Sequence, residues 1–73
     1  MEYKTSDIVL AAFLKLNGAV LLRIDKQGQK GTFVFDGVDL ALVASYDLGN
    51  ARVDPVNFNN TIKQLTTSVR RMD

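Results

Sequence analysis

Hydrophobic residues first gather in a segment that has almost no polar position. The stretch "TSDIVLAAFLKLNG", residues 5–18, opens on Thr5, Ser6 and Asp7, which offer an N-cap and an acidic first turn, and closes on Asn17-Gly18, a typical helix stop. Only Lys15 interrupts the apolar residues between them. A helix that is apolar on nearly every side is buried in its own domain or covered by a second chain. The pattern therefore predicts a central helix and leaves open which chain covers it.

The next stretch, "VLLRIDKQGQKGTFVF" at residues 20–35, has the pattern of a β-hairpin. A two-residue turn at Gln27-Gly28 would place Ile24 opposite Gly31. Since neighbours along a strand point to opposite sides, one face is then wholly apolar and consists of Val20, Leu22, Ile24, Phe33 and Phe35. The other face is mixed and consists of Leu21, Arg23, Asp25, Lys30, Thr32 and Val34. A slip of one residue would exchange the faces, so turn and pattern support the same register.

Two further helices follow the hairpin. The first is expected within Val38–Leu48, with Asp36 or Asp39 at its start and Gly49-Asn50 at its end. The second begins at Asp54-Pro55, a good N-cap followed by a residue suited to the first helical position. Its apolar residues are spaced alternately by four and three positions, and they are Phe58, Ile62, Leu65, Val69 and Met72. Ala51–Val53 is a candidate for a short third strand laid against the hairpin edge.

These elements predict one small α+β domain over residues 1–73, with a β-hairpin packed against about three helices in the order α-β-β-α-α. A sheet of two strands is marginal by itself, so the helices must cover its apolar face. The open edges of the hairpin could pair with a second copy or be blocked.

Composition excludes most catalytic chemistry. The chain has no His and no Cys, so it lacks imidazole bases, thiolate nucleophiles and disulfides. Most carboxylates fall at the ends of predicted elements, where caps and turns explain them; they are Asp7, Asp25, Asp36, Asp39, Asp47 and Asp54. We therefore expect no enzyme, no catalytic residue, no metal site and no cofactor.

The same composition bounds the location. The net charge is +1, and the longest dense apolar run, Ile8–Leu14, is too short to span a bilayer. No signal peptide is visible. We expect a soluble cytoplasmic protein that makes no membrane contact, in the host cytoplasm if the protein is viral.

Three motifs give the chain a family resemblance. "YKTSDIVLAAFL" at Tyr3–Leu14, "GTFVFD" at Gly31–Asp36 and "VDPVNFNNTIKQL" at Val53–Leu65 resemble the DUF5659 family, a small domain of uncharacterised function found in bacteria and phages. The resemblance covers nearly the whole chain and implies a phage or mobile-element origin. The motifs consist mostly of capping and core residues, so the resemblance supplies no catalytic residue.

Basic residues form the first candidate interaction site. Arg23, Lys26 and Lys30 cluster at the hairpin tip, and Arg70 and Arg71 at the end of the last helix could extend the cluster toward phosphates. The competing interpretation is structural. Hairpin tips are polar because they are solvated, Asp25 opposite Lys30 would offset the charge, and cations at a helix C-terminus complement its dipole.

Apolar residues form the second candidate site. The proposed interface consists of Leu21, Val34, Leu65, Val69 and Met72. These residues could equally pack on the protein's own core. The sequence favours a non-enzymatic interaction or regulatory protein that binds a host or phage protein, or itself as a homodimer. The alternative is a small nucleic-acid-binding regulator that uses the basic residues.

Overall fold

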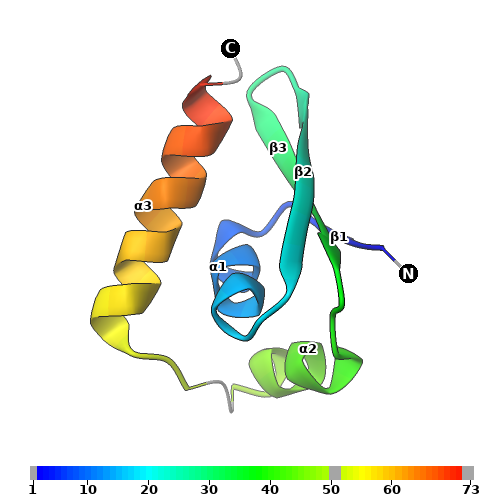
Figure 1. Cartoon of the computed structure of the whole chain (residues 1–73), viewed down its shortest axis with the longest axis vertical. Helices are drawn as coiled ribbons and strands as arrows, with labels where there is room; N and C mark the ends of the chain where they lie inside the picture. Colours follow the sequence, from blue (N-terminus) through cyan, green and yellow to red (C-terminus); the bar gives the residue numbers. More distant parts are fainter. Residues whose placement is uncertain (1, 50–51, 72–73) are drawn as a thin grey trace.

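The structure, a computed structural model, describes residues 2–49 and 52–71. In chain order its elements are β1 (Tyr3–Thr5), α1 (Ile8–Leu16), β2 (Val20–Gln27), β3 (Lys30–Asp36), α2 (Leu40–Asp47) and α3 (Pro55–Arg71). Helix α1 lies at the centre, with the sheet on one side and α3 on the other, while α2 lies across the base (Figure 1). The α+β class and the predicted order of the helices and the hairpin are confirmed, and an N-terminal strand precedes them.

Aspartate side chains begin these three helices: Asp54 as predicted, Asp7 among the three candidates for the first helix, and Asp39 of the two for the second. Asp7 accepts hydrogen bonds from the backbone N–H groups of Val9 and Leu10, at 2.9 and 3.3 Å. Asp39 accepts from the N–H of Ala41 and Asp54 from that of Val56, each at 2.9 Å. Each bond satisfies a donor that the first helical turn would otherwise leave unpaired.

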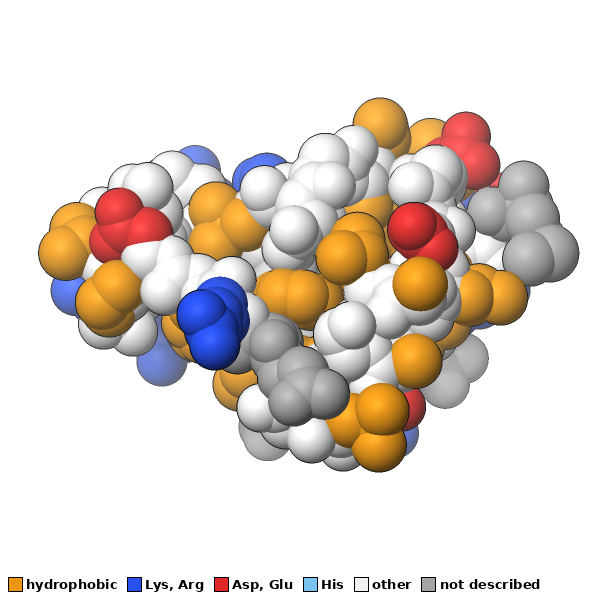
Figure 2. Space-filling model, turned by 90° about the horizontal axis from the view of Figure 1, so that it is seen from below, with side chains coloured by type: hydrophobic (Ala, Val, Ile, Leu, Met, Phe, Trp, Pro, Cys, Tyr) orange, Lys and Arg blue, Asp and Glu red, His pale blue; other side chains and the backbone are white. Residues whose placement is uncertain are grey.

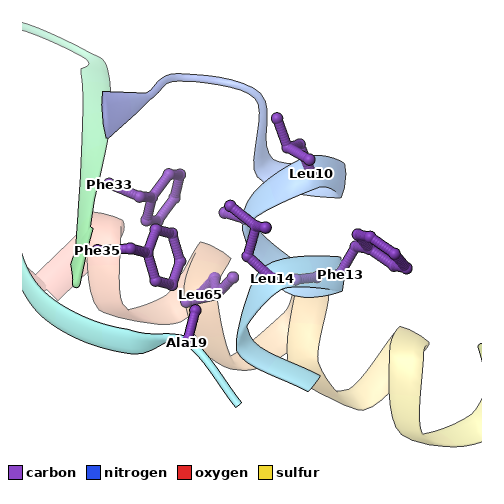
Figure 3. Packing of buried hydrophobic residues seen from close by; sticks show 9 residues of the cluster. Leu10, Phe13, Leu14, Ala19, Phe33, Phe35 and Leu65 are labelled. Carbon is purple, nitrogen blue, oxygen red and sulfur yellow. The ribbon is translucent and has the colours of Figure 1, made fainter. Parts of the chain in front are cut away.

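Helix α1 is covered by its own chain. Its buried residues are Leu10, Ala11, Ala12, Phe13 and Leu14. In Figure 3, Phe33 and Phe35 of β3 project from the sheet toward the side of α1 that carries Leu14, and Leu65 of α3 lies beside them. The hydrophobic core therefore lies between the sheet, α1 and α3, and most of the apolar residues of α1 are buried within one chain, while Val9 and Leu16 remain exposed.

The hairpin turns one residue later than predicted. Its central residues are Gly28 and Gln29, and Gln27 pairs with Lys30. Gly28 has a φ of 62°, whereas no described residue other than glycine has a positive φ. A turn that needs positive φ only at its first central residue selects Gly28 for that place. The predicted pairing is therefore displaced by two residues near the turn, where Ile24 lies opposite Phe33 instead of Gly31.

A displacement by two residues leaves the two faces of the hairpin unchanged, but a β-bulge on β2 exchanges them at the start of the strand. The pairing shifts between Leu21 and Arg23, so Leu21 lies opposite Phe35 and Ile24 opposite Phe33. Leu21 joins the core cluster, while Val20 and Leu22 remain 58% and 46% exposed. The predicted assignment of Val20 and Leu22 to the core face is therefore wrong, because a bulge inserts one residue and exchanges the faces beyond it.

The third strand comes from the N-terminus. Strand β1 pairs antiparallel with β3, and Tyr3 lies opposite Phe35, so β3 is the central strand. In the predicted strand at Ala51–Val53, Ala51 lies outside the described residues and Arg52 and Val53 are not in a strand, so this prediction fails where the structure describes it.

Helix α2 is attached to α1 by an aromatic contact and a hydrogen bond. The ring centroids of Phe13 and Tyr46 lie 5.9 Å apart, and the Tyr46 hydroxyl donates to Oδ2 of Asp7 at 3.1 Å. Burial raises the pKa of Tyr46, and the neighbouring Asp7 carboxylate raises it further. Asp7, the N-cap of α1, thus also binds Tyr46 of α2.

We expect Tyr46→Phe to lower the free energy of unfolding at pH 7 by about 0.5–1 kcal/mol, the loss of one partly exposed hydrogen bond. Because its pKa is raised in the folded chain, the neutral Tyr46 phenol stabilises the fold. This stabilisation is fully present below pH about 10, the pKa of tyrosine in the unfolded chain, and is lost as the pH rises through the higher pKa of the folded chain. Urea titrations at pH 7 and at about pH 11 should show a smaller alkaline loss in the variant than in the wild type. Tyr3→Phe leaves the Tyr46 hydrogen bond in place and is the control; equal alkaline losses in Tyr46→Phe and wild type would contradict the assignment.

Candidate interaction surfaces

The hairpin tip and the C-terminal end of α3 lie next to each other at one end of the molecule (Figure 1). A cleft of about 290 Å³ between them is lined by Lys26, Gln29, Val69 and Arg70. A second cleft, of about 270 Å³, shares Gln29, Val69 and Arg70 and extends to Phe33. The structure thus brings together Lys26 and Arg70, two of the predicted basic residues that are 44 positions apart in the sequence.

Arg23 is engaged elsewhere. Its guanidinium donates to both carboxylate oxygens of Glu2, at 3.2 and 3.3 Å, and its Nε donates to Oδ1 of Asp25 at 3.2 Å. These carboxylates raise the pKa of Arg23, and Arg23 in turn lowers the pKa of Glu2. Two acidic partners offset the charge of Arg23, so it adds little to a basic site at the tip.

The other basic residues are only partly grouped. Arg71 lines a different cleft, on α3 with Lys63, Gln64, Thr67 and Ser68. Lys30 is exposed opposite Gln27, and Asp25 lies opposite Thr32, so the predicted pairing of Asp25 with Lys30 is wrong. The basic end therefore consists of Lys26 and Arg70 at a shared cleft, with Lys30 and Arg71 nearby.

Most of the predicted apolar interface lies in the interior. Val34 and Leu65 are 0% and 1% exposed, and Leu21 and Val69 are half-buried against the core. Met72 lies outside the described residues. Val34 lies on the central strand β3, where it pairs with Lys4 of β1 on one side and with Arg23 of β2 on the other. Val34 is covered because β1 adds this second neighbour. Val34 and Leu65 are therefore not available on the surface to a partner.

Other apolar side chains are exposed, and the sequence prediction missed them. Leu40 and Leu48 lie at the two ends of α2, Val56 lies in the first turn of α3, and Leu16 ends α1; Leu48 and Val56 are 75% and 66% exposed. We call these four residues the basal surface. Figure 2 views the molecule from this end and shows apolar side chains interspersed with charged ones. A cleft of about 220 Å³ beside Leu16 is lined by Arg52, Val53, Asp54 and Asn57.

The described residues offer few groups for catalysis. Asp7, Asp39 and Asp54 are used as helix caps. Within residues 2–49 and 52–71, no cluster of three or more acidic side chains is placed to hold a metal ion. No helix in this part of the chain is long and apolar enough to cross a membrane.

Comparison with known proteins gives one family. The family model described as "Domain of unknown function (DUF5659)" matches residues 1–70 of the 73-residue chain. No curated protein and no solved structure matches the chain significantly. The match spans all six elements of the fold. The chain therefore belongs to the DUF5659 family.

Proposed function

We propose that this chain is a non-enzymatic interaction protein that acts in the cytoplasm by binding a protein partner or a second copy of itself. The observation that carries the proposal is the set of large apolar side chains left on the surface, at the basal surface and on β2. Figure 2 shows that apolar side chains at the base are interspersed with polar and charged ones, so a partner here would bury a mixed surface. The resemblance noted in the sequence supports an origin in a phage or another mobile element.

The chemistry of the chain supports binding over catalysis. Without His or Cys, the sequence lacks the side chains that most often act as bases and nucleophiles near neutral pH. The caps and the Arg23 ion pairs engage Asp7, Asp25, Asp39 and Asp54. What the described surface offers is apolar side chains and several cations, among them Lys30, Arg70 and Arg71.

Light scattering tests self-association directly. We expect about twice the 8.1 kDa mass of the chain at both low and high salt, because salt does not screen apolar burial. Capture on the immobilised chain tests a protein partner. We expect Leu48→Asp to lose the captured protein and Leu48→Ala to retain most of it. The proposal is contradicted if the wild-type chain is a monomer and Leu48→Asp captures the same proteins as the wild type does.

A nucleic-acid-binding regulator is the second candidate, favoured by the cleft that Lys26 and Arg70 share. It requires binding to duplex DNA that weakens steeply with salt, since phosphate contacts release counterions. Lys26→Glu combined with Lys30→Glu should then abolish binding, while Lys15→Glu on α1 should leave it intact. If the wild type ignores DNA at low salt, this candidate is excluded.

A further inference from the structure

Strand β2 forms an open edge of the sheet. The strand order is β1-β3-β2, so β2 has β3 on one side, and no strand of the described residues pairs with its other side. At eight residues it is much longer than β1, the three-residue strand at the opposite edge. An exposed edge presents unpaired N–H and C=O groups to another strand.

The side chains on this edge are accessible. Val20 and Leu22 are exposed near the start of β2, and the side chains of Arg23 and Asp25 are 46% and 50% exposed. The bulge is confined to the region between Leu21 and Arg23, and pairing from Arg23 to Gln27 is regular. The second half of β2 is therefore suited to forming another ladder.

We propose that β2 pairs antiparallel with β2 of a second copy of this chain, giving a continuous six-stranded sheet. This inference rests on the proposed function and names the partner and the surface used. A two-fold axis perpendicular to the sheet keeps the apolar faces of both copies on the same side. Strand pairing of this kind uses backbone hydrogen bonds for affinity and side chains for register.

Charge selects the register. With the axis at residue 23, Arg23 would face Arg23 of the second copy, and with the axis at residue 25, Asp25 would face Asp25. With the axis at Ile24, Arg23 of each copy faces Asp25 of the other, which gives two opposite-charge pairs. Directly opposed like charges destabilise a sheet and opposed unlike charges stabilise it. The axis therefore passes through Ile24.

Contacts within the chain have to rearrange for this pairing. Arg23 is already held by both oxygens of Glu2, and its Nε is 3.2 Å from Oδ1 of Asp25 on the same strand. Arg23 and Asp25 therefore lie on one face of β2, as the cross-copy pairs require. Because Glu2 lies beyond β3, on β1's side of the sheet, the Arg23 guanidinium must leave Glu2 and turn to the open edge of β2 to meet Asp25 of the second copy.

Charge reversal tests the register. Arg23→Asp and Asp25→Arg each place like charges at both contacts, so each should raise the self-dissociation constant at least about tenfold. The double variant Arg23→Asp/Asp25→Arg restores opposite charges and should recover the wild-type dissociation constant. Mixing the two single variants should give a heterodimer, because two acids then face two arginines. Sedimentation equilibrium measures all four cases, and Glu2→Gln, which should remain dimeric, is the control.

The outcomes separate this inference from the proposed function. Single variants that dimerise as tightly as the wild type, with unchanged circular dichroism, would overturn the β2 pairing. If Leu48→Asp instead abolishes the dimer, self-association uses the basal surface, and the proposed function survives without this inference. If the wild type is a monomer but still captures a partner that Leu48→Asp does not, the β2 pairing is likewise overturned and the proposed function survives. Loss in the single variants with recovery in the double variant supports the β2 pairing.

Discussion

Replacing Phe35 with alanine is expected to lower the free energy of unfolding by about 3–5 kcal/mol and to leave most of the chain unfolded. Phe35 is 0% exposed on the central strand, between Tyr3 of β1 and Leu21 of β2. Its ring projects into the core toward Leu65 (Figure 3). A domain of this size has a total stability of only about 3–5 kcal/mol, so the loss of one such side chain consumes nearly all of it.

Urea denaturation followed by circular dichroism measures this loss. The matched control is Val20→Ala on the same sheet, where the side chain is 58% exposed and the expected change is within about 0.5 kcal/mol. A Phe35→Ala chain that stays folded with a loss below about 1 kcal/mol would show that the core does not depend on this ring.

Gly31→Val is expected to cost about 1–3 kcal/mol through overpacking. Gly31 lies on β3 where the hairpin approaches α3. A Cβ atom at this position would lie 3.1 and 3.3 Å from the two methyl carbons of Val69, and 3.5 Å from Cγ2 of Ile24. The wider valine side chain therefore requires the hairpin and α3 to move apart. Thermal or urea unfolding measures the cost.

A second substitution on α3 identifies the cause. Val69→Ala removes the two methyl groups that approach Gly31, so the double variant Gly31→Val/Val69→Ala should lose less stability than the sum of the two single losses. The expected coupling is about 0.5–3 kcal/mol, the range for residues in contact. Strict additivity would mean that Gly31 is required for a reason other than the approach of Val69.

Features with local causes were predictable from the sequence. Asp7, Asp39 and Asp54 cap helices through bonds to N–H groups two or three positions away, so the signal and its effect lie in the same short stretch. The hairpin turn was misplaced because "QGQ" contains one glycine that fits either of two turns. The observed turn places Gly28 first, with a φ of 62°, and a bulge between Leu21 and Arg23 then brings Leu21 against the core.

The candidate sites were harder to predict because distant segments decide them. Arg23 adds little to the basic tip because it forms an ion pair with Glu2, which lies 21 positions away in the sequence. Val34 is removed from the surface because a three-residue strand, too short to show alternation, pairs beside it. In contrast, Lys26 and Arg70 do line one cleft, since a hairpin tip and a helix end can meet without changing either element.

The central position of α1 bears on how the chain emerges from the ribosome. Strand β1 and helix α1 precede the segments that cover them, since β3 follows α1 by about 20 residues and α3 follows it by about 40. At translation speeds of about 5–20 residues per second, the helix is without its full cover for seconds. During this interval the nascent chain presents the apolar surface that attracts chaperones, although the finished protein buries it.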